Sequence, residues 1–287
     1  MNILQKYEIK AKNNPPITIG MGFGNFTFHS QKIIAASIDF LKNFNSNISI
    51  YGKKEILPKS LKQISERTEV SRLKFIESQD PERAAIESLK QNSIQALIRG
   101  SFSSSKFLKS LKDTLNITVI NRLAILETVK EDQFFYGPVG IDECNNVENK
   151  ITYIENALKE FQEIEIVPKI SILSGGRLSD IGRDTKVNQT IKDAIKIIDS
   201  LKKKYPELMI SHNEILIEEA LENDSNLIIA PDGISGNLVY RTLVHLGGGK
   251  AYGAIYMGIG KPIIDTSRVG DYSEFYGALV LALALSN

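Results

Sequence analysis

Short apolar runs alternate with longer amphipathic segments along most of the chain, and this alternation constrains the fold more than any other feature. Each run has the length of a buried strand, and each following segment carries apolar residues at helical spacing. Repeated strand–helix alternation is typical of mostly parallel sheets with helices on both faces. The sequence therefore predicts an α/β protein.

The expected elements follow from this pattern. Strands are expected at Ile17–Met21, Ile48–Tyr51, Phe75–Ile76, Ile94–Ile98, Thr118–Leu126, Gln133–Val139, Lys169–Ser174, Leu227–Ala230, Ala251–Met257 and Pro262–Asp265. Helices are expected at Gln31–Phe44, Ser60–Glu69, Pro81–Gln91, Ser104–Leu115, Val147–Glu163, Val187–Lys204, Leu238–Leu246 and Tyr272–Leu285. The alternation changes in the middle of the chain, which we interpret as an inserted domain. We expect a first lobe of residues 1–122 and 262–287, a second lobe of residues 123–261, and a ligand cleft between them.

Composition excludes several classes of protein. A chain of 287 residues with a net charge of +1 offers no whole-molecule case for nucleic-acid or membrane binding. The single cysteine, Cys144, excludes an internal disulfide and fits a reducing cytoplasm. Its acidic neighbours would raise the pKa of the thiol, which disfavours a nucleophile. The first residues lack the apolar core of a signal peptide, and the longest apolar run, near Gly277–Leu285, is too short to span a bilayer. We expect a soluble, cytoplasmic protein.

Two common sites are not indicated. The loop Gly20–Asn25 follows the first strand, but its glycines do not match the G-x-G-x-x-G spacing of a dinucleotide site. A tight structural turn is the favoured interpretation. The histidines His29, His212 and His245 stand apart and lack metal-ligand spacing, so no metal site is expected.

A serine-rich segment follows the strand Ile94–Ile98 and opens a helix. Ser101, Ser103 and Ser104, with Arg99, could bind a phosphate together with the free N–H groups of the helix start. The alternative is an ordinary serine helix cap.

A glycine-rich loop carries Arg177 and Arg183, six residues apart. Arginine can bind a carboxylate or a phosphate in bidentate fashion. The alternative is pairing within the loop, because Asp180 and Asp184 are available there.

A third strand-to-helix junction contains Asp232, Gly236 and Asn237. Gly236 allows a ligand to approach the backbone closely, and the Asp and Asn side chains could contact it. The alternative is a helix cap formed by the same polar side chains.

Ser267 and Arg268 end the last strand, and Glu274 follows seven residues after Ser267. The serine could stabilise an oxyanion, the arginine could neutralise a phosphoryl group, and the glutamate could take a proton from an attacking thiol or alcohol. A surface ion pair between Arg268 and Glu274 is the alternative.

The order of these segments resembles the phosphate acetyl/butyryltransferase superfamily. Its P-D-x-x-A-G-N, G-P-x-x-Q-G-x-x-K-P and N-D-L-S-R-G segments are similar to Pro231–Asn237, Gly253–Pro262 and Ile264–Arg268. The G-G-R-x-x-D-I-G-R loop at 175–183 resembles the methanogenesis marker protein 4 group, the methyltransferase-related MtxX proteins. The resemblance implies the two-lobed, usually dimeric fold of isocitrate and isopropylmalate dehydrogenases.

The resemblance also implies a chemistry. Ser267 and Arg268 match the residues that stabilise the acyl-phosphate transition state, and Glu274 matches an Asp that activates the coenzyme A thiol. This chain departs from the pattern at Val269, where the family has Gly, and at Met257, where it has Gln. We therefore expect a transferase for a phosphorylated or CoA-like anion with an altered substrate.

No resident cofactor is expected, and coenzyme A or a methanogen thiol would act as a substrate. Besides its anionic small molecule, the chain is expected to bind a second copy of itself. The alternative function is a non-catalytic accessory subunit in methanogen methyl-transfer metabolism. A dehydrogenase of the same fold is disfavoured by the imperfect glycine loop.

Overall fold

A computed structural model describes residues 1–24, 27–56 and 71–286, with the side chains of 27–30 left out of the description. The helix expected at Ser60–Glu69 lies outside these residues. Contacts divide the chain into two compact units, which are described separately below. Unit 1 comprises Met1–Ile120 and Ala251–Asn287, and unit 2 comprises Asn121–Lys250.

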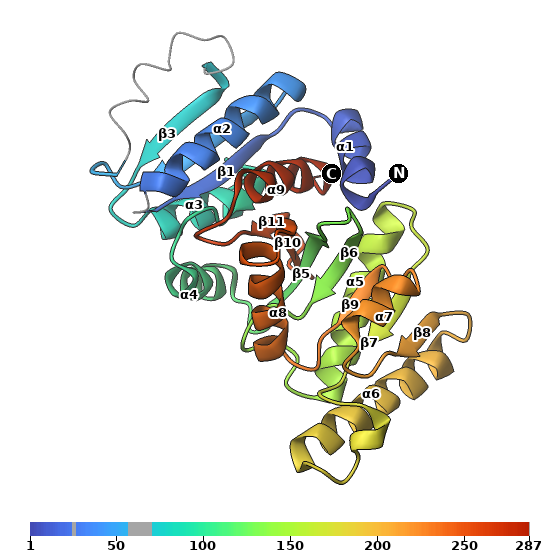
Figure 1. The fold of residues 1–287 in the computed structure, drawn as a ribbon. Coiled ribbons are helices and arrows are strands. Elements are labelled where there is room, and N and C mark those ends of the chain that lie inside the picture. The colour runs from blue at the N-terminus through green and yellow to red at the C-terminus, as the bar shows by residue number, and fades with distance from the viewer. Residues whose placement is uncertain (25–26, 57–70, 287) are drawn as a thin grey trace. The chain divides into compact units, whose positions relative to one another are not determined.

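Unit 1 is built on a mostly parallel sheet (Figure 1). Its strands are β1 (Thr18–Phe23), β2 (Asn47–Gly52), β3 (Leu73–Glu77), β4 (Ala96–Ile98), β10 (Lys250–Met257) and β11 (Ile263–Asp265). They lie in the order β3-β2-β1-β4-β11-β10. All neighbouring pairs are parallel except β10 with β11. The carboxyl ends of β1 to β4 and of β11 therefore meet at one edge of the sheet.

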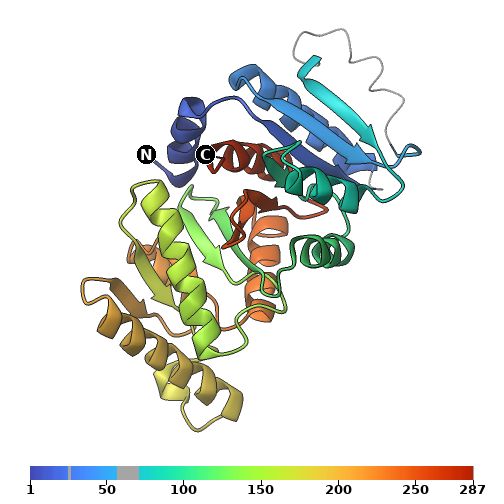
Figure 2. The same cartoon turned by 180° about the vertical axis from the view of Figure 1, so that it is seen from behind.

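Helices cover both faces of this sheet. They are α1 (Ile3–Asn13), α2 (Thr27–Asn43), α3 (Pro81–Lys90), α4 (Ser104–Leu115) and α9 (Tyr272–Ala284). The connection through α2 leads from β1 toward the β3 edge, whereas the connection through α3 leads back to β4. Because such crossovers are right-handed, the two helices lie on opposite faces. Figures 1 and 2 show α2 with α9 on one face and α3 on the other.

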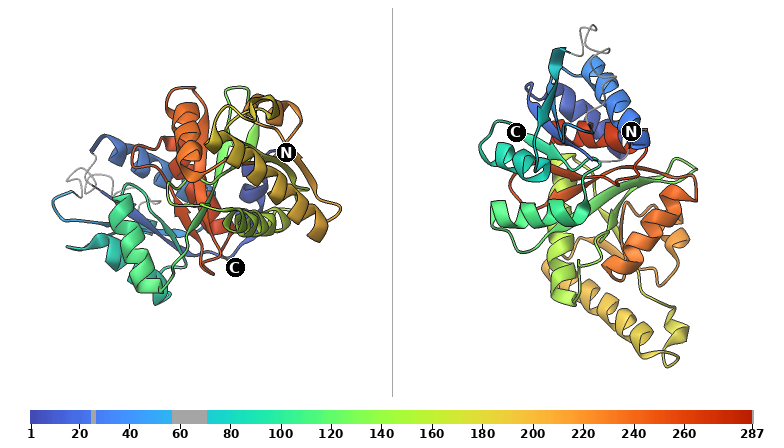
Figure 3. Two further views of the ribbon diagram at one scale, coloured as in Figure 1. Left: turned by 90° about the horizontal axis from the view of Figure 1, so that it is seen from below. Right: turned by 90° about the vertical axis from the view of Figure 1, so that its left-hand side faces the viewer.

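The last helix forms much of the core of unit 1. In α9, Glu274, Phe275 and every residue from 277 to 284 are buried. The helix contacts α1, α2, β1, β4 and β11. On the other face α3 packs against α4, as Figure 3 also shows. Unit 1 therefore depends on segments from both ends of the sequence.

Unit 2 is a second α/β layer structure. Its strands are β5 (Asn121–Glu127), β6 (Gln133–Gly137), β7 (Lys169–Ile172), β8 (Met209–His212) and β9 (Leu227–Ile229), in the order β5-β6-β9-β7-β8. Its helices are α5 (Val147–Glu163), α6 (Thr185–Lys204), α7 (Ile217–Glu222) and α8 (Gly233–His245), with a short 3₁₀ turn, η3 (Leu178–Asp180). β5 and β6 form an antiparallel pair, and the remaining strands are parallel.

The structure differs from the expected elements at several places. The expected α/β class is confirmed, and α4 and α5 have the predicted bounds. The sequence analysis did not anticipate α1, β8 and α7, and it started α8 at Leu238 instead of Gly233. Residues 251–261, expected in the second lobe, belong to unit 1. The reason is that β10 pairs with β11, which continues the sheet beside β4. Within the described chain, no helix is long and apolar enough to cross a membrane.

Candidate functional site

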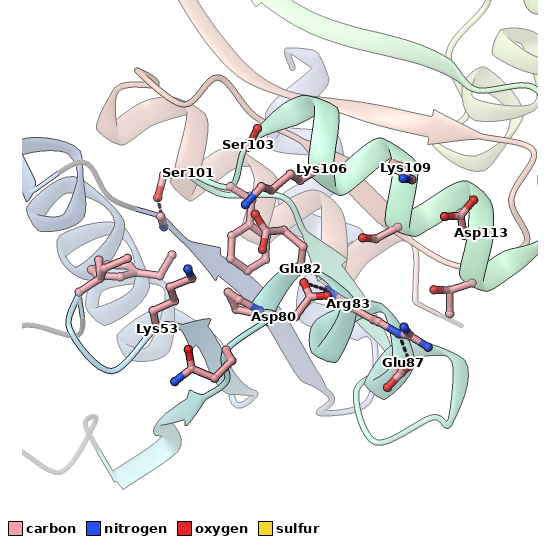
Figure 4. Close-up of a pocket in the computed structure, with 18 of the residues that line it drawn as sticks. Lys53, Asp80, Glu82, Arg83, Glu87, Ser101, Ser103, Lys106, Lys109 and Asp113 are labelled. Carbon is pink, nitrogen blue, oxygen red and sulfur yellow. Dashed lines mark hydrogen bonds and ion pairs between the residues drawn. The ribbon is translucent and has the colours of Figure 1, made fainter.

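A cavity of about 1340 Å³ opens in unit 1 at the carboxyl edge of its sheet (Figure 4). The loops after β1, β2, β3 and β4 all contribute to its lining. The strand order reverses between β1 and β4, since the chain moves outward from β1 to β3 and then returns to β4. Ligands of open parallel sheets bind at such a reversal, outside the carboxyl ends of the strands. The topology therefore favours this cavity as the ligand site.

Glycines after β1 allow the loops after β1 and β4 to approach each other. A Cβ on Gly22 would lie 2.2 Å from the Arg99 carbonyl oxygen, and one on Gly24 would lie 2.3 Å from that of Ser101. The Gly24 N–H donates a 2.8 Å hydrogen bond to the Ser101 hydroxyl. The glycines therefore serve backbone packing, as the structural interpretation of this loop requires.

Arg99 is buried inside this loop pair, with 5% of its surface exposed. Its guanidinium pairs with Asp265 and donates to the carbonyl oxygens of Thr266 and Phe102, the latter at 2.8 Å. These bonds join the loop after β4 to the end of β11. The expectation that Arg99 contacts a phosphate is corrected, because its side chain is occupied in holding these loops together.

The serine segment lies at the start of α4. Ser101 and Ser103 line the cavity, whereas Ser104 begins the helix outside the lining. Ser103 is the N-cap residue, but its side chain makes no capping hydrogen bond. The first N–H groups of a helix have no intrahelical partner and attract anions. Ser103 and the start of α4 are therefore suited to hold a phosphate.

The loop after β11 brings Arg268 to the cavity. Of the three residues expected to be catalytic, Arg268 lines the cavity, while Ser267 and Glu274 do not. The Ser267 N–H donates a 2.7 Å hydrogen bond to Glu274 Oε1, and the Gly270 N–H donates to the Ser267 carbonyl at 3.0 Å. Glu274 is buried with 3% exposure. In the structure one carboxylate oxygen of Glu274 binds the loop backbone, and the proton-accepting role expected for Glu274 stays a prediction.

Charged side chains also line the cavity, and all of them except Arg268 were missed by the sequence analysis. The basic ones are Lys53, Arg83, Lys90, Lys106, Lys109 and Arg268, and the acidic ones are Asp80, Glu82, Glu87 and Asp113. Basic groups are thus in excess. Arg83 pairs with Glu87 at 2.8 Å, and Lys90 donates to the Thr114 carbonyl oxygen at 3.0 Å. Lys53, Lys106 and Lys109 have no bonded partner among the described residues, which leaves their charges for an anionic ligand.

A positional signal could have found these residues. Lys53 directly follows β2. Glu82 lies in the first turn of α3, the helix after β3, and Lys106 lies in the first turn of α4, the helix after β4. Residues just beyond the carboxyl ends of parallel strands are the usual ligand contacts. The sequence showed these positions, but only the strand order shows that they converge.

In unit 2, Arg183 makes an ion pair within the arginine loop, which was the alternative interpretation, whereas Arg177 contributes a backbone hydrogen bond. Arg183 pairs with Asp180, and the Arg177 N–H donates to Asp180 Oδ2 at 2.9 Å. The Arg177 backbone bond lowers the pKa of Asp180 most, and the hydrogen bond from the Arg183 side chain lowers it further. Asp184 accepts hydrogen bonds from Lys186 N and Val187 N and caps α6. Both arginines are exposed.

The junction at Asp232 is likewise a helix cap. Asp232 accepts a 2.7 Å bond from Ser235 N in a reciprocal capping box. Burial acts to raise the pKa of Asp232, but the Ser235 hydrogen bonds leave it lowered. A Cβ on Gly236 would lie 1.9 Å from the Pro138 carbonyl oxygen, and Asn237 Nδ2 donates to that of Val139 at 2.9 Å. These residues fix α8 onto the loop after β6.

Cys144 is not a nucleophile in this structure. The thiol is buried with 4% exposure. Burial, and then the charge of Glu143, raise its pKa to about 12. Since the thiolate is the reactive form, the thiol is inert near neutral pH, as expected from its acidic neighbours.

Comparison with known proteins defines the class. A family model described as Phosphate acetyl/butaryl transferase matches residues 59–283, so the chain belongs to this family. Within it, the expected similarity to the MtxX group is confirmed. The relative named "Putative methyltransferase mtx subunit X" from Methanosarcina mazei is 42% identical over 217 residues, which are 75% of each chain.

Two further proteins extend the comparison. Phosphate acetyltransferase from Borreliella burgdorferi is 24% identical over 322 aligned positions and 89% of each chain. The crystal structure of a phosphotransacetylase from Streptococcus pyogenes matches with a TM-score of 0.73 and 14% identity, over 100% of this chain and 99% of that one. At this identity the structural match shows a shared fold.

Proposed function

We propose that the chain is a phosphate acyltransferase-like enzyme that binds a phosphorylated or CoA-like anionic small molecule in the cavity of unit 1. One observation carries this proposal. Groups suited to an anion lie together at the carboxyl edge of the sheet. They are the start of α4, the Ser103 hydroxyl, which makes no capping bond, the three lysines without a described partner (Lys53, Lys106 and Lys109) and Arg268. Membership of the phosphate acetyl/butaryl transferase family supports the reaction class.

Each group of the site would have a different role in acyl transfer. The phosphate of an acyl phosphate would be held by the α4 N–H groups, Ser103 and Lys106. A thiol attacks the acyl carbon, the new C–S bond replaces the C–O bond to phosphate, and the phosphate leaves with the negative charge. The thiol proton passes to solvent or to the departing phosphate. Arg268 would stabilise charge on the transferred group, and the Ser267–Glu274 bond would fix the loop that carries Arg268.

Ligand binding is the first test. Thermal unfolding should be measured with inorganic phosphate, acetyl phosphate and coenzyme A. We expect at least one of these anions to raise the melting temperature, since a ligand that binds only the native state stabilises it. The variant Arg268→Ala should reduce the shift, whereas Arg183→Ala, which removes an exposed arginine of unit 2, should not. If wild-type protein shows no shift with any anion, the proposed ligand site is wrong.

Catalysis is a separate test. Acyl exchange between acetyl phosphate and coenzyme A or coenzyme M should be measured with wild-type protein, Ser267→Ala and Arg268→Ala. We expect exchange by the wild type and a loss of about 100-fold or more in Arg268→Ala, as for removal of a transition-state donor. Ser267→Ala keeps the backbone N–H that binds Glu274 and should lose less activity. Circular dichroism should show that both variants remain folded.

The second candidate is a non-catalytic subunit in methyl-transfer metabolism. The observation that favours it is the name of the relatives, which describes a subunit of a methyltransferase. Val269 and Met257 replace the family's Gly and Gln, which is consistent with lost or altered chemistry. Anion binding without exchange of any acyl donor would support this candidate.

Light scattering of the same preparation tests the expected homodimer.

A further inference from the structure

Glu82 is a buried carboxylate in the wall of the cavity. It is the second residue of α3 and has 8% of its surface exposed. It lines the cavity, and in Figure 4 it lies between the Ser101–Ser103 loop and the Arg83–Glu87 pair. Within the described part of the chain it has no hydrogen-bond or ion-pair partner. Most of the residue is covered by neighbouring atoms, and the carboxylate can find a partner only from the side of the cavity.

Capping of α3 does not explain Glu82. The N-cap residue is Asp80, whose side chain accepts a hydrogen bond from Arg83 N, and Pro81 occupies the first position of the helix. The N-terminus of α3 thus already has its acceptor. Glu87, on the same helix, differs from Glu82 because its carboxylate is paired with Arg83 at 2.8 Å. The carboxylate of Glu82 faces the cavity, and no described residue around it pairs with it.

The same cavity is lined by groups of opposite character. Ser103, Lys106 and Lys53 are suited to an anion, whereas Glu82 can only accept hydrogen bonds when it is ionised. A ligand that is only a phosphate would be repelled by this carboxylate. A ligand that carries a hydrogen-bond donor beyond its phosphate would satisfy both parts of the lining.

We propose that Glu82 accepts a hydrogen bond from an amino or hydroxyl group of the phosphorylated ligand, and so selects ligands that carry such a donor. This inference rests on the proposed function, because it concerns the same cavity. It narrows the ligand class from anions in general to phosphate esters with a donor group. Glu82 is a specificity residue that contacts the ligand away from the transferred group.

The test uses three phosphate esters of nearly equal size: propyl phosphate, 2-hydroxyethyl phosphate and 2-aminoethyl phosphate, together with their analogues that are two carbons longer. Dissociation constants are measured by calorimetry. We expect wild-type protein to bind the hydroxyl or the amino ester at least about fivefold tighter than the alkyl ester, which is the range for one added hydrogen bond. The two donor arms distinguish an alcohol from an amine.

Variants assign the preference to one residue. In Glu82→Leu the preference should fall to about onefold, because the acceptor is gone. Glu82→Gln keeps an acceptor oxygen but loses the negative charge, so it should weaken the preference for the amino ester more than the preference for the hydroxyl ester. The matched control is Glu87→Gln, a carboxylate of the same cavity, which should keep the preference.

The outcomes are separable. Equal binding of all esters by wild-type protein, or a preference that survives in Glu82→Leu, overturns the inference and leaves the proposed ligand site intact. If neither phosphate nor any ester binds, the proposed function is wrong and the inference falls with it. If Glu82→Leu fails to fold, the isosteric variant Glu82→Gln decides the question, and an amino-ester preference of wild-type size in that variant overturns the inference.

Discussion

The backbone N–H of Ser267 donates a 2.7 Å hydrogen bond to Glu274 Oε1, across seven residues of sequence. The bond joins the loop after β11 to the first turn of α9. Glu274 is buried with 3% exposure, and the hydrogen bond as a whole is partly buried. Because Arg268 lies next to Ser267 and lines the cavity, a buried carboxylate determines where an exposed arginine can act.

Glu274 is predicted to position this loop. Glu274→Ala leaves the partly buried Ser267 N–H without its acceptor, which should lower the free energy of unfolding by about 1 kcal/mol and weaken phosphate binding. Glu274→Gln keeps an acceptor oxygen and should retain most of the binding and any exchange activity. Urea unfolding and calorimetry check both. A folded Glu274→Gln variant that binds ligand but has lost all exchange would show instead that Glu274 accepts a proton.

Arg99 and Asp265 form a buried pair, with 5% and 7% exposure. Arg99→Ala should lower the free energy of unfolding by about 3–5 kcal/mol, because it leaves Asp265 as an uncompensated buried charge. The control is Arg83→Ala, which removes an exposed pair and should leave stability unchanged. Equal effects of the two variants in urea unfolding would contradict the structural role of Arg99.

Gly22 is predicted to resist any side chain. In Gly22→Ala the new Cβ would lie 2.2 Å from the Arg99 carbonyl oxygen, so the loops after β1 and β4 must separate. We expect a loss of about 1–3 kcal/mol in stability and weaker phosphate binding. Gly175→Ala is the control, since its Cβ would lie 3.2 Å from Thr190 Oγ1, a contact that a shift of a few tenths of an ångström relieves. Unchanged binding and stability in Gly22→Ala would show that this close approach does not matter.

Cys144 gives a prediction for pH. Burial raises its pKa from the ordinary value of 9.0 to about 12, so the native state favours the protonated thiol. The stabilisation is fully present below about pH 9 and is lost as pH rises from there toward 12, because the unfolded state releases its proton first. Iodoacetamide should therefore label the native protein far more slowly than the urea-unfolded protein at pH 8. Equal labelling rates would mean that the thiol is accessible and ionised.

Much of the fold could be predicted because local signals agreed with it. The bounds of α4 and α5 follow from their caps and apolar spacing. The helix α1 was missed although Asn2 and Gln5 form a capping box and the buried Ile3, Tyr7 and Ala11 recur every four residues. Short length and polar composition hid that pattern.

Other features depend on contacts distant in sequence. Gly233 and Gly236 indicated a loop, yet they lie in the first turn of α8, where side chains would collide with Gly140 and Pro138. The spacing of Ser267 and Glu274 suggested proximity but not that the carboxylate faces the backbone. Glu82 and Lys53 meet in one cavity because of the strand order, which no local pattern contains.

The burial of α9 has a consequence for synthesis of the protein. Unit 2 is one continuous segment, Asn121–Lys250, whereas unit 1 is completed by Tyr272–Ala284. Domains emerge from the ribosome from the N-terminal end and fold as units when their residues are present. The first 120 residues must therefore wait, with an open apolar face, while unit 2 is made and folds. The segment of the chain that is translated first is the one that reaches its native packing last.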